Sequence, residues 1–303
     1  SRFGQSSTEL DDGRVVLIAG EHEDYYDPDF YIYNDVVVKK PDGTLDIYGY
    51  PKEVFTPTDF HSATLAGKSI IVIGSLGYPN DRKLGSTQVY VLDLSNFSIA
   101  TVQCNGNSPG WLHRHNAVYS SEDNAILITG GLIETGDKNK QLPENIDDWK
   151  LHLTDWRWER LTERKWQRWD LYRKDRKRNA LWDIRELEFY KTISARGDKW
   201  GKEQAVEALS KVRKELGFEP DLSLLTELYN PPIPHETLPK NEDEYNVYRI
   251  KIDGVTVRYI EDGWFIRITV EGDLPAATGE ALASDILNKV SALEKQPYEL
   301  VRL

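Results

Sequence analysis

The chain has 303 residues, of which 39% are hydrophobic and 29% are charged, a composition typical of a folded globular protein. It contains no apolar run near the roughly 20 residues that a membrane span requires. Residues 1–5 show no secretory pattern of charged and then apolar residues. The single cysteine, Cys104, excludes an internal disulfide and is consistent with a reducing compartment. We therefore expect a cytoplasmic protein.

The formal net charge of −12 is spread unevenly. Residues 1–160 hold 14 Lys and Arg against 24 Asp and Glu, a net charge of −10, whereas residues 161–200 carry +5 and residues 201–303 carry −7. An acidic front half disfavours nucleic acid as its partner and favours a basic protein surface.

The first half contains a repeat of about 55 residues. Three apolar strands end in small residues that are 55 and 56 positions apart: Gly20, Ser75 and Gly131. A further strand precedes the second and third of them, and each is followed by an alternating strand and a short closing strand. Four strands per unit at this period predict the blades of a β-propeller.

In the third unit the sequence resembles the Kelch repeat family. The matching features are a double glycine after an apolar strand, an alternating strand and a closing tryptophan, formed by Gly130, Gly131, Asp148, Trp149, Leu151, Leu153 and Trp158. The segment 109–118 also looks like the start of many Kelch blades. The second unit departs from the pattern with Ser75 and Ile99, and the first unit departs further. The resemblance covers residues 1–160 and implies a partial Kelch-type propeller of about three four-stranded blades that serves as a binding scaffold.

Three blades do not close a propeller, which normally has four to eight. The open options are completion by self-association, capping by the C-terminal half, or further blades that the pattern does not reveal. Because an uncapped stack exposes an apolar face and a sheet edge, we expect the C-terminal half or a homodimer to cover it.

The middle segment, residues 163–240, is predicted to be helical and to end in a proline-rich linker. Trp166, Trp169 and Tyr172 recur at three-residue steps, which fits one helical face. Basic residues interleave with these aromatic ones, so the segment reads either as a nucleic-acid or membrane surface or as a packed helix with a solvated basic face; we favour the packed helix. A second helix is predicted at 204–216, with Ala205 and Leu209 in its buried stripe, and Asp221 is placed to cap a third.

The last sixty residues predict a separate small α+β unit. Asp253-Gly254 is a strong hairpin signal between two alternating segments, and a third strand, a helix at about 278–294 and a final strand at 298–303 follow. The predicted domains are therefore 1–162 with the blades, 163–240 with the helices and linker, and 241–303 with an antiparallel three-stranded meander, a helix and a strand.

No catalytic motif stands out. His113 and His115 share one face of a predicted strand, and His61 occupies in the second unit the place of His115 in the third, which favours a structural or channel-lining role over a catalytic one. No third ligand lies at a recognised metal-binding spacing, and Cys104 lacks a base that would activate it. We expect no catalytic residue, metal or cofactor.

The predicted function is non-enzymatic protein binding through the long loops that follow the apolar strands, at 21–33, 76–86 and 132–146. An immunity protein that neutralises a basic toxin would be one example of such a role. The alternative is an enzyme with its active site on the blade rim or in the C-terminal domain. The candidate binding residues are aromatic, histidine and arginine side chains of these loops and of the blade-starting strands: Tyr25, Tyr26, Phe60, His61, Trp111, His113 and Arg114.

Overall fold

A computed structural model describes residues 2–24, 27–136, 143–196, 199–241, 244 and 246–303. The chain divides into two compact units, Ser1–Arg164 and Lys165–Leu303. None of the helices formed by the described residues has the length and apolarity that crossing a membrane requires.

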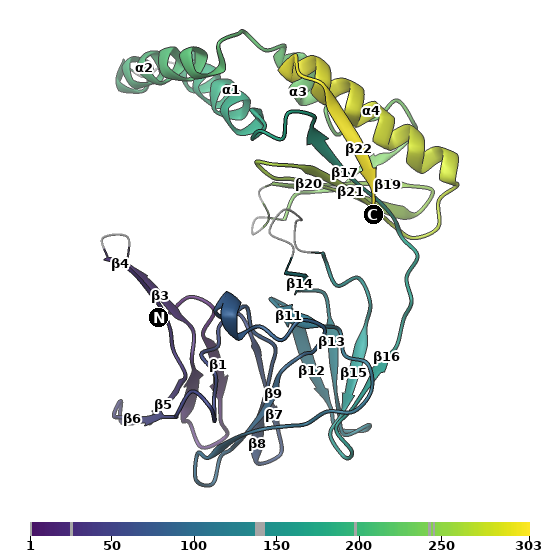
Figure 1. The fold of residues 1–303 in the computed structure, drawn as a ribbon. Helices are drawn as coiled ribbons and strands as arrows, with labels where there is room; N and C mark the ends of the chain where they lie inside the picture. Colours follow the sequence, from purple (N-terminus) through teal and green to yellow (C-terminus); the bar gives the residue numbers. More distant parts are fainter. Residues whose placement is uncertain (1, 25–26, 137–142, 197–198, 242–243, 245) are drawn as a thin grey trace. The chain divides into compact units, whose positions relative to one another are not determined.

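The first unit is built from three four-stranded antiparallel sheets (Figure 1). The first sheet contains β1 (Ser6–Glu9), β2 (Val15–Ile18), β5 (Asp35–Lys39) and β6 (Leu45–Gly49). The second contains β7 (Ser62–Ala66), β8 (Ser69–Ile73), β9 (Val89–Asp93) and β10 (Ile99–Thr101). The third contains β12 (Asn116–Ser120), β13 (Ala125–Thr129), β15 (Trp149–His152) and β16 (Arg157–Arg160). The four strands predicted for each repeat are therefore present, and the first repeat has its own leading strand, β1.

Side chains alternate between the two faces of each strand, and this alternation builds the core between sheets. One cluster joins the first sheet to the second through residues such as Val16, Val38 and Leu92. Another joins the second sheet to the third through Ile71, Ile126 and other side chains. The second sheet is thus buried on both faces, which explains why β8 reads as a continuous apolar run.

Long connections leave the same end of all three sheets (Figure 1). The first holds a hairpin of β3 (Glu21–Asp24) and β4 (Asp27–Ile32), and the second holds the short helix η1 (Pro79–Asp81). In the third, β14 (Leu132–Glu134) pairs with β11 (Trp111–His113), the strand that leads into the third sheet.

The second unit is a six-stranded antiparallel sheet in the order β18-β19-β20-β21-β17-β22. Its strands are β17 (Gln167–Arg173), β18 (Glu236–Thr237), β19 (Val247–Ile252), β20 (Val255–Glu261), β21 (Ile266–Glu271) and β22 (Tyr298–Arg302). Its helices are α1 (Leu181–Arg196), α2 (Lys199–Leu216), α3 (Leu222–Thr226) and α4 (Ala276–Glu294). Side chains of α1, α3 and α4 form one core with one face of the sheet, and α2 packs on α1.

The predicted helix around Trp166–Tyr172 is wrong, because residues 167–173 form strand β17. Trp169 and Leu171 are buried in the core, while Asp170 between them forms an ion pair of 2.8 Å with Arg267. This is the two-residue period of a strand. The strand lies between β21 and β22, so residues 163–240 and 241–303 share one sheet and one core instead of forming two domains.

The other elements predicted for the second half are present. Helix α2 buries Ala205, Leu209 and Val212, and Gly217 follows it with a φ of +71°. Asp221 caps α3 by accepting a hydrogen bond from the amide of Ser223. The meander of β19, β20 and β21, the helix α4 and the strand β22 follow in the predicted order.

Candidate functional sites

In the first unit, the first long connection contacts the second, and the second contacts the third. We call the described residues of 21–33, 76–86 and 132–146 the loop face. The backbone N–H of Ile32 donates to Tyr78 Oη at 2.8 Å, which ties the first connection to the second. Arg82 and Glu134 form an ion pair of 2.8 Å that ties the second to the third. The loop face is therefore one continuous surface rather than three independent loops.

Trp111 and His113, two of the predicted binding residues, are buried beneath this surface. Trp111 is 2% exposed and donates its indole N–H to the carbonyl of Leu76 at 3.0 Å. His113 is 1% exposed, and its Nε2 lies 3.8 Å from a carboxylate oxygen of Glu134. Burial, together with the charges of Arg114 and Arg82, lowers the pKa of His113 to about 4, so the imidazole is neutral at physiological pH.

Phe60 and Arg114 come together as a stacked pair. The guanidinium carbon of Arg114 lies 3.5 Å from the centroid of the Phe60 ring, a cation–π contact. Both residues have a positive φ, 47° and 57°, which is uncommon for side chains other than glycine. Each begins the segment leading to the first strand of its sheet, at the position that Gly4 holds before β1.

His61 contributes to the joint between the first and second sheets. Its Nε2 lies 2.8 Å from Ser6 Oγ, and at the next joint His115 Nε2 lies 2.8 Å from Ser62 Oγ. Burial lowers the pKa of His61 to about 3, with a further effect from His115, and burial lowers the pKa of His115 to about 4. Both imidazoles are therefore neutral hydrogen-bonding groups between sheets.

The predicted binding residues thus differ in what they offer a partner. Phe60, His61, Trp111, His113 and Arg114 lie at the joints between sheets; His61, Trp111 and His113 are buried there, whereas Phe60 is half-buried and Arg114 is exposed. Tyr25 and Tyr26 lie outside the described residues. Exposed apolar side chains on the loop face, which the sequence argument did not single out, are Tyr31 at 55% and Leu84 at 50%.

Sequence reasoning also missed Asp59, which is fully buried. Its Oδ1 accepts a hydrogen bond of 2.6 Å from the amide of Gly77 and a longer one from Ser75 Oγ. Among the described residues its Oδ2 has no hydrogen-bond partner. A carboxylate just before His61 was a visible signal, but only the fold shows that it anchors the second connection. Within the described part of the chain, no group of three or more His, Cys, Asp or Glu side chains is placed to hold a metal ion.

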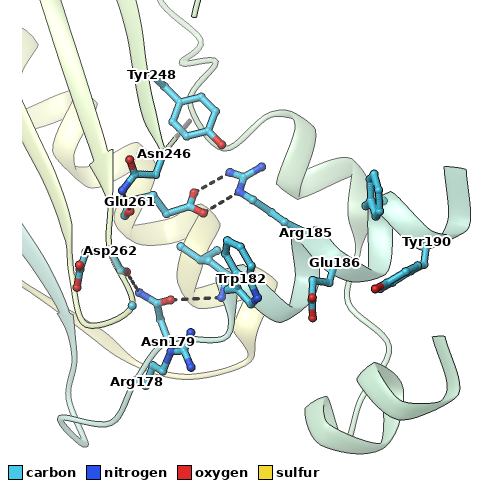
Figure 2. A pocket seen from close by; sticks show the side chains of 13 residues that line it. Arg178, Asn179, Trp182, Arg185, Glu186, Tyr190, Asn246, Tyr248, Glu261 and Asp262 are labelled. Atoms are coloured by element: carbon cyan, nitrogen blue, oxygen red, sulfur yellow. Dashed lines mark hydrogen bonds and ion pairs between the residues drawn. The ribbon is translucent and has the colours of Figure 1, made fainter. Parts of the chain in front are cut away.

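The second unit has a pocket of about 510 Å³ between α1 and the strands β19 and β20 (Figure 2). Apolar, aromatic and polar side chains line it: Arg178, Asn179, Leu181, Trp182, Arg185, Glu186, Phe189, Tyr190, Asn246, Tyr248, Glu261 and Asp262, with Gly263. A volume in this range is typical of small-molecule sites. The sequence did not predict this pocket, because its walls come from segments about 70 residues apart.

An ion pair dominates the pocket wall. Arg185 donates two hydrogen bonds of 2.7 Å to the two carboxylate oxygens of Glu261 (Figure 2). Tyr229 Oη donates a third to this carboxylate at 2.8 Å. Burial opposes the charge of Arg185, but the hydrogen bonds and charge of Glu261 outweigh it and raise the pKa of Arg185. Burial, and then Glu261, raises the pKa of Tyr248 to about 12. The carboxylate of Glu261 thus already accepts hydrogen bonds from Arg185 and Tyr229, which argues against its use as a general base.

Comparisons with known proteins give no assignment. No protein-family model matches the chain, and no curated protein matches it significantly. Among solved structures, 78 chains match. One of them, titled "Structure of YjhT", is 13% identical with a TM-score of 0.40. That match covers 54% of this chain and 56% of that one, so the chain spans about half the length of that structure.

Proposed function

We propose that the chain is a non-enzymatic protein-binding scaffold of the Kelch type, whose three sheets are blades of a partial propeller. The observation that supports this proposal is the continuous loop face, held together by the bonds Ile32–Tyr78 and Arg82–Glu134. A rigid scaffold that presents joined loops suits recognition of a large surface. The exposed Tyr31 and Leu84 provide apolar contact area on it.

The partner that fits this surface is a basic protein. The first connection carries five acidic residues and no Lys or Arg between positions 21 and 32. In the other connections, the acidic residues Asp81 and Glu134 form ion pairs with Lys52 and Arg82. The excess of acidic residues in the first connection would steer a basic surface toward it, and binding would weaken as salt rises.

Site-specific photocrosslinking tests this function. A photoreactive amino acid would replace Tyr31 or Leu84 in the chain expressed in its native cells, and the control would carry it at Val206 on α2, which is 62% exposed. We expect both loop-face positions to yield the same adduct with a basic protein, and the control position to lack it. Identical adducts at all three positions, or none on the loop face, would rule the proposal out.

The pocket of the second unit favours a second candidate, an enzyme or small-molecule binder. Its volume and its aromatic lining are the observations in favour. The ion pair Arg185–Glu261 in its wall serves structure, so a ligand would contact Trp182 and Tyr248 instead. Replacing Trp182 by Ala should then abolish an activity of the purified chain while leaving the photocrosslinked adduct intact.

A further inference from the structure

Three kinds of hydrogen bond repeat at both joints between sheets. In the first kind, a serine on the leading strand of one sheet bonds to a histidine of the next sheet: Ser6 to His61 and Ser62 to His115. In the second, the backbone N–H that precedes the leading strand donates to its equivalent in the previous sheet: Phe60 to Gly4, and Arg114 to Phe60. The joint is therefore a repeated structural device.

In the third kind of hydrogen bond, the backbone donor belongs to the earlier sheet and the acceptor to the next one, the reverse of the second kind. The N–H of Gly20 donates to the carbonyl of Thr58, and the N–H of Ser75 donates to the carbonyl of Leu112, both at 2.9 Å. At each joint, the earlier sheet therefore offers a serine hydroxyl, a backbone carbonyl and a backbone N–H. The later sheet offers the matching groups, which are a histidine, a backbone N–H and a backbone carbonyl.

The two end sheets carry the same kinds of group at their outer ends. On the third sheet, Asn116 occupies the serine position, and the carbonyl of Arg114 and the N–H of Gly131 correspond to the groups by which Phe60 and Ser75 bond to the neighbouring sheet. On the first sheet, Gln5 occupies the histidine position, and the N–H of Gly4 and the carbonyl of Arg2 correspond to those of Phe60 and Thr58. The side-chain N–H of Gln5 donates to the carbonyl of Ala19 at 3.1 Å, so its carboxamide oxygen is the group that can accept a hydrogen bond from Asn116.

The outward faces of the end sheets also expose apolar side chains. On the first sheet, Leu17, Val37 and Ile47 are cross-strand neighbours, and Ile47 is 68% exposed. On the third sheet, Val118 lies opposite Leu127 and is 63% exposed. On each face an exposed apolar side chain thus lies beside half-buried apolar neighbours, and a docked sheet would cover them.

We propose that the third sheet of one chain docks on the first sheet of a second copy, and that the same joint forms twice to close a ring of six sheets. The occupant is a second copy because the groups at the joint positions of the third sheet match those of the first sheet of this chain, in continuity with the two joints already present. A head-to-tail contact of this kind closes only if its rotation permits, and six sheets lie within the usual range for propellers. The inference rests on the proposed blade architecture.

Cysteine crosslinking of the full chain tests the joint. With Cys104→Ser in every variant, chains carrying Asn116→Cys would be mixed with chains carrying Gln5→Cys and treated with a short bis-maleimide. We expect a two-chain product in the mixture and none from either variant alone. Product from one variant alone would indicate a contact between identical surfaces, and no product at all would indicate that the joint does not form. Either result would overturn the proposal.

The double variant Asn116→Cys/Gln5→Cys tests closure. A closed pair predicts that crosslinking stops at two chains, whereas a ladder of larger products would show an open array and contradict the ring. In sedimentation, Val118→Arg should shift the dimer to monomer, and Val206→Arg on α2, with an almost equal exposure of 62%, should leave it unchanged. If the wild-type chain is a monomer at all concentrations, the ring is refuted. The photocrosslinking adducts at the loop face would still test the binding function separately.

Discussion

Two buried histidines each connect neighbouring sheets of the first unit. His61 and His115 hydrogen-bond to serines of the preceding sheet and stay neutral, because burial lowers their pKa values to about 3 and about 4. Their recurrence at equivalent positions was visible in the sequence and predicted a structural or channel-lining role. The serines that bind them were not predicted, because they lie more than 50 residues away.

These histidines make the first unit sensitive to acid. Their folded-state pKa values lie below the unfolded value of about 6.5, so the unfolded chain binds protons that the folded chain does not as pH falls. We expect each histidine to cost the first unit about 2 kcal/mol between pH 7 and pH 5. Hydrogen exchange of the slowest amides in β8 measures this. His61→Gln should reduce the pH dependence and the exposed His22→Gln should not; an unchanged slope in His61→Gln would contradict the assignment.

Glu294 gives the second unit the opposite pH dependence. Its side chain is fully buried, and burial raises its pKa to about 7, against smaller opposing effects of Tyr298, the amide of Ala180 and Arg173. Since this folded-state value exceeds the unfolded one, stability is full at acidic pH and falls as pH rises through 7. Glu294→Gln should stabilise the unit by about 2 kcal/mol more at pH 8 than at pH 5, measured from the slowest amides of β21. An equal effect at both pH values would show that the carboxyl does not titrate near 7.

The Arg185–Glu261 pair should be costly to break from one side. Removing the guanidinium leaves the carboxylate, whose side chain is 9% exposed, buried without its counter-charge. Arg185→Met should therefore destabilise the second unit by about 3–5 kcal/mol. Adding Glu261→Gln removes the charge and keeps an acceptor for Tyr229, so the double variant should recover part of the loss in urea denaturation. A double variant as unstable as the single one would show that the loss comes from packing.

At the scale of elements, sequence prediction succeeded where the pattern is local. The apolar strands of the first unit repeat at a fixed spacing, and Asp253-Gly254 forms the expected turn with positive φ at both residues. Strand β17 was misread because Trp166, Trp169 and Tyr172 also fit a helical period over a short window. Its true partners, β21 and β22, lie about 100 and 130 residues further along the chain.

The position of β17 predicts how the second unit can be divided. Residues 165–303 contain the whole six-stranded sheet and its core, so this fragment should unfold cooperatively in urea, as followed by circular dichroism. Residues 241–303 lack Trp169 and Leu171 of β17 and Leu181 of α1, which leaves the core open. That shorter fragment should show no cooperative transition. A native-like transition in it would restore the separate α+β domain predicted from sequence.

At the scale of the whole molecule, a binding scaffold and its binding loops stay predictions from the sequence, which did not show how the loops contact one another. The bonds Ile32–Tyr78 and Arg82–Glu134 connect residues that belong to different repeats. The pocket was missed for the same reason, since its walls come from α1 and from β19 and β20, about 70 residues apart in the chain. Both sites depend on contacts that a one-dimensional pattern does not encode.

Hydrogen exchange of the chain with and without the partner captured through Tyr31 tests the central claim most directly. Binding through the loop face predicts slower exchange at residues 76–86 and 132–136, with little change in α1. Slowing confined to α1, β19 and β20 around the pocket of the second unit would contradict the account.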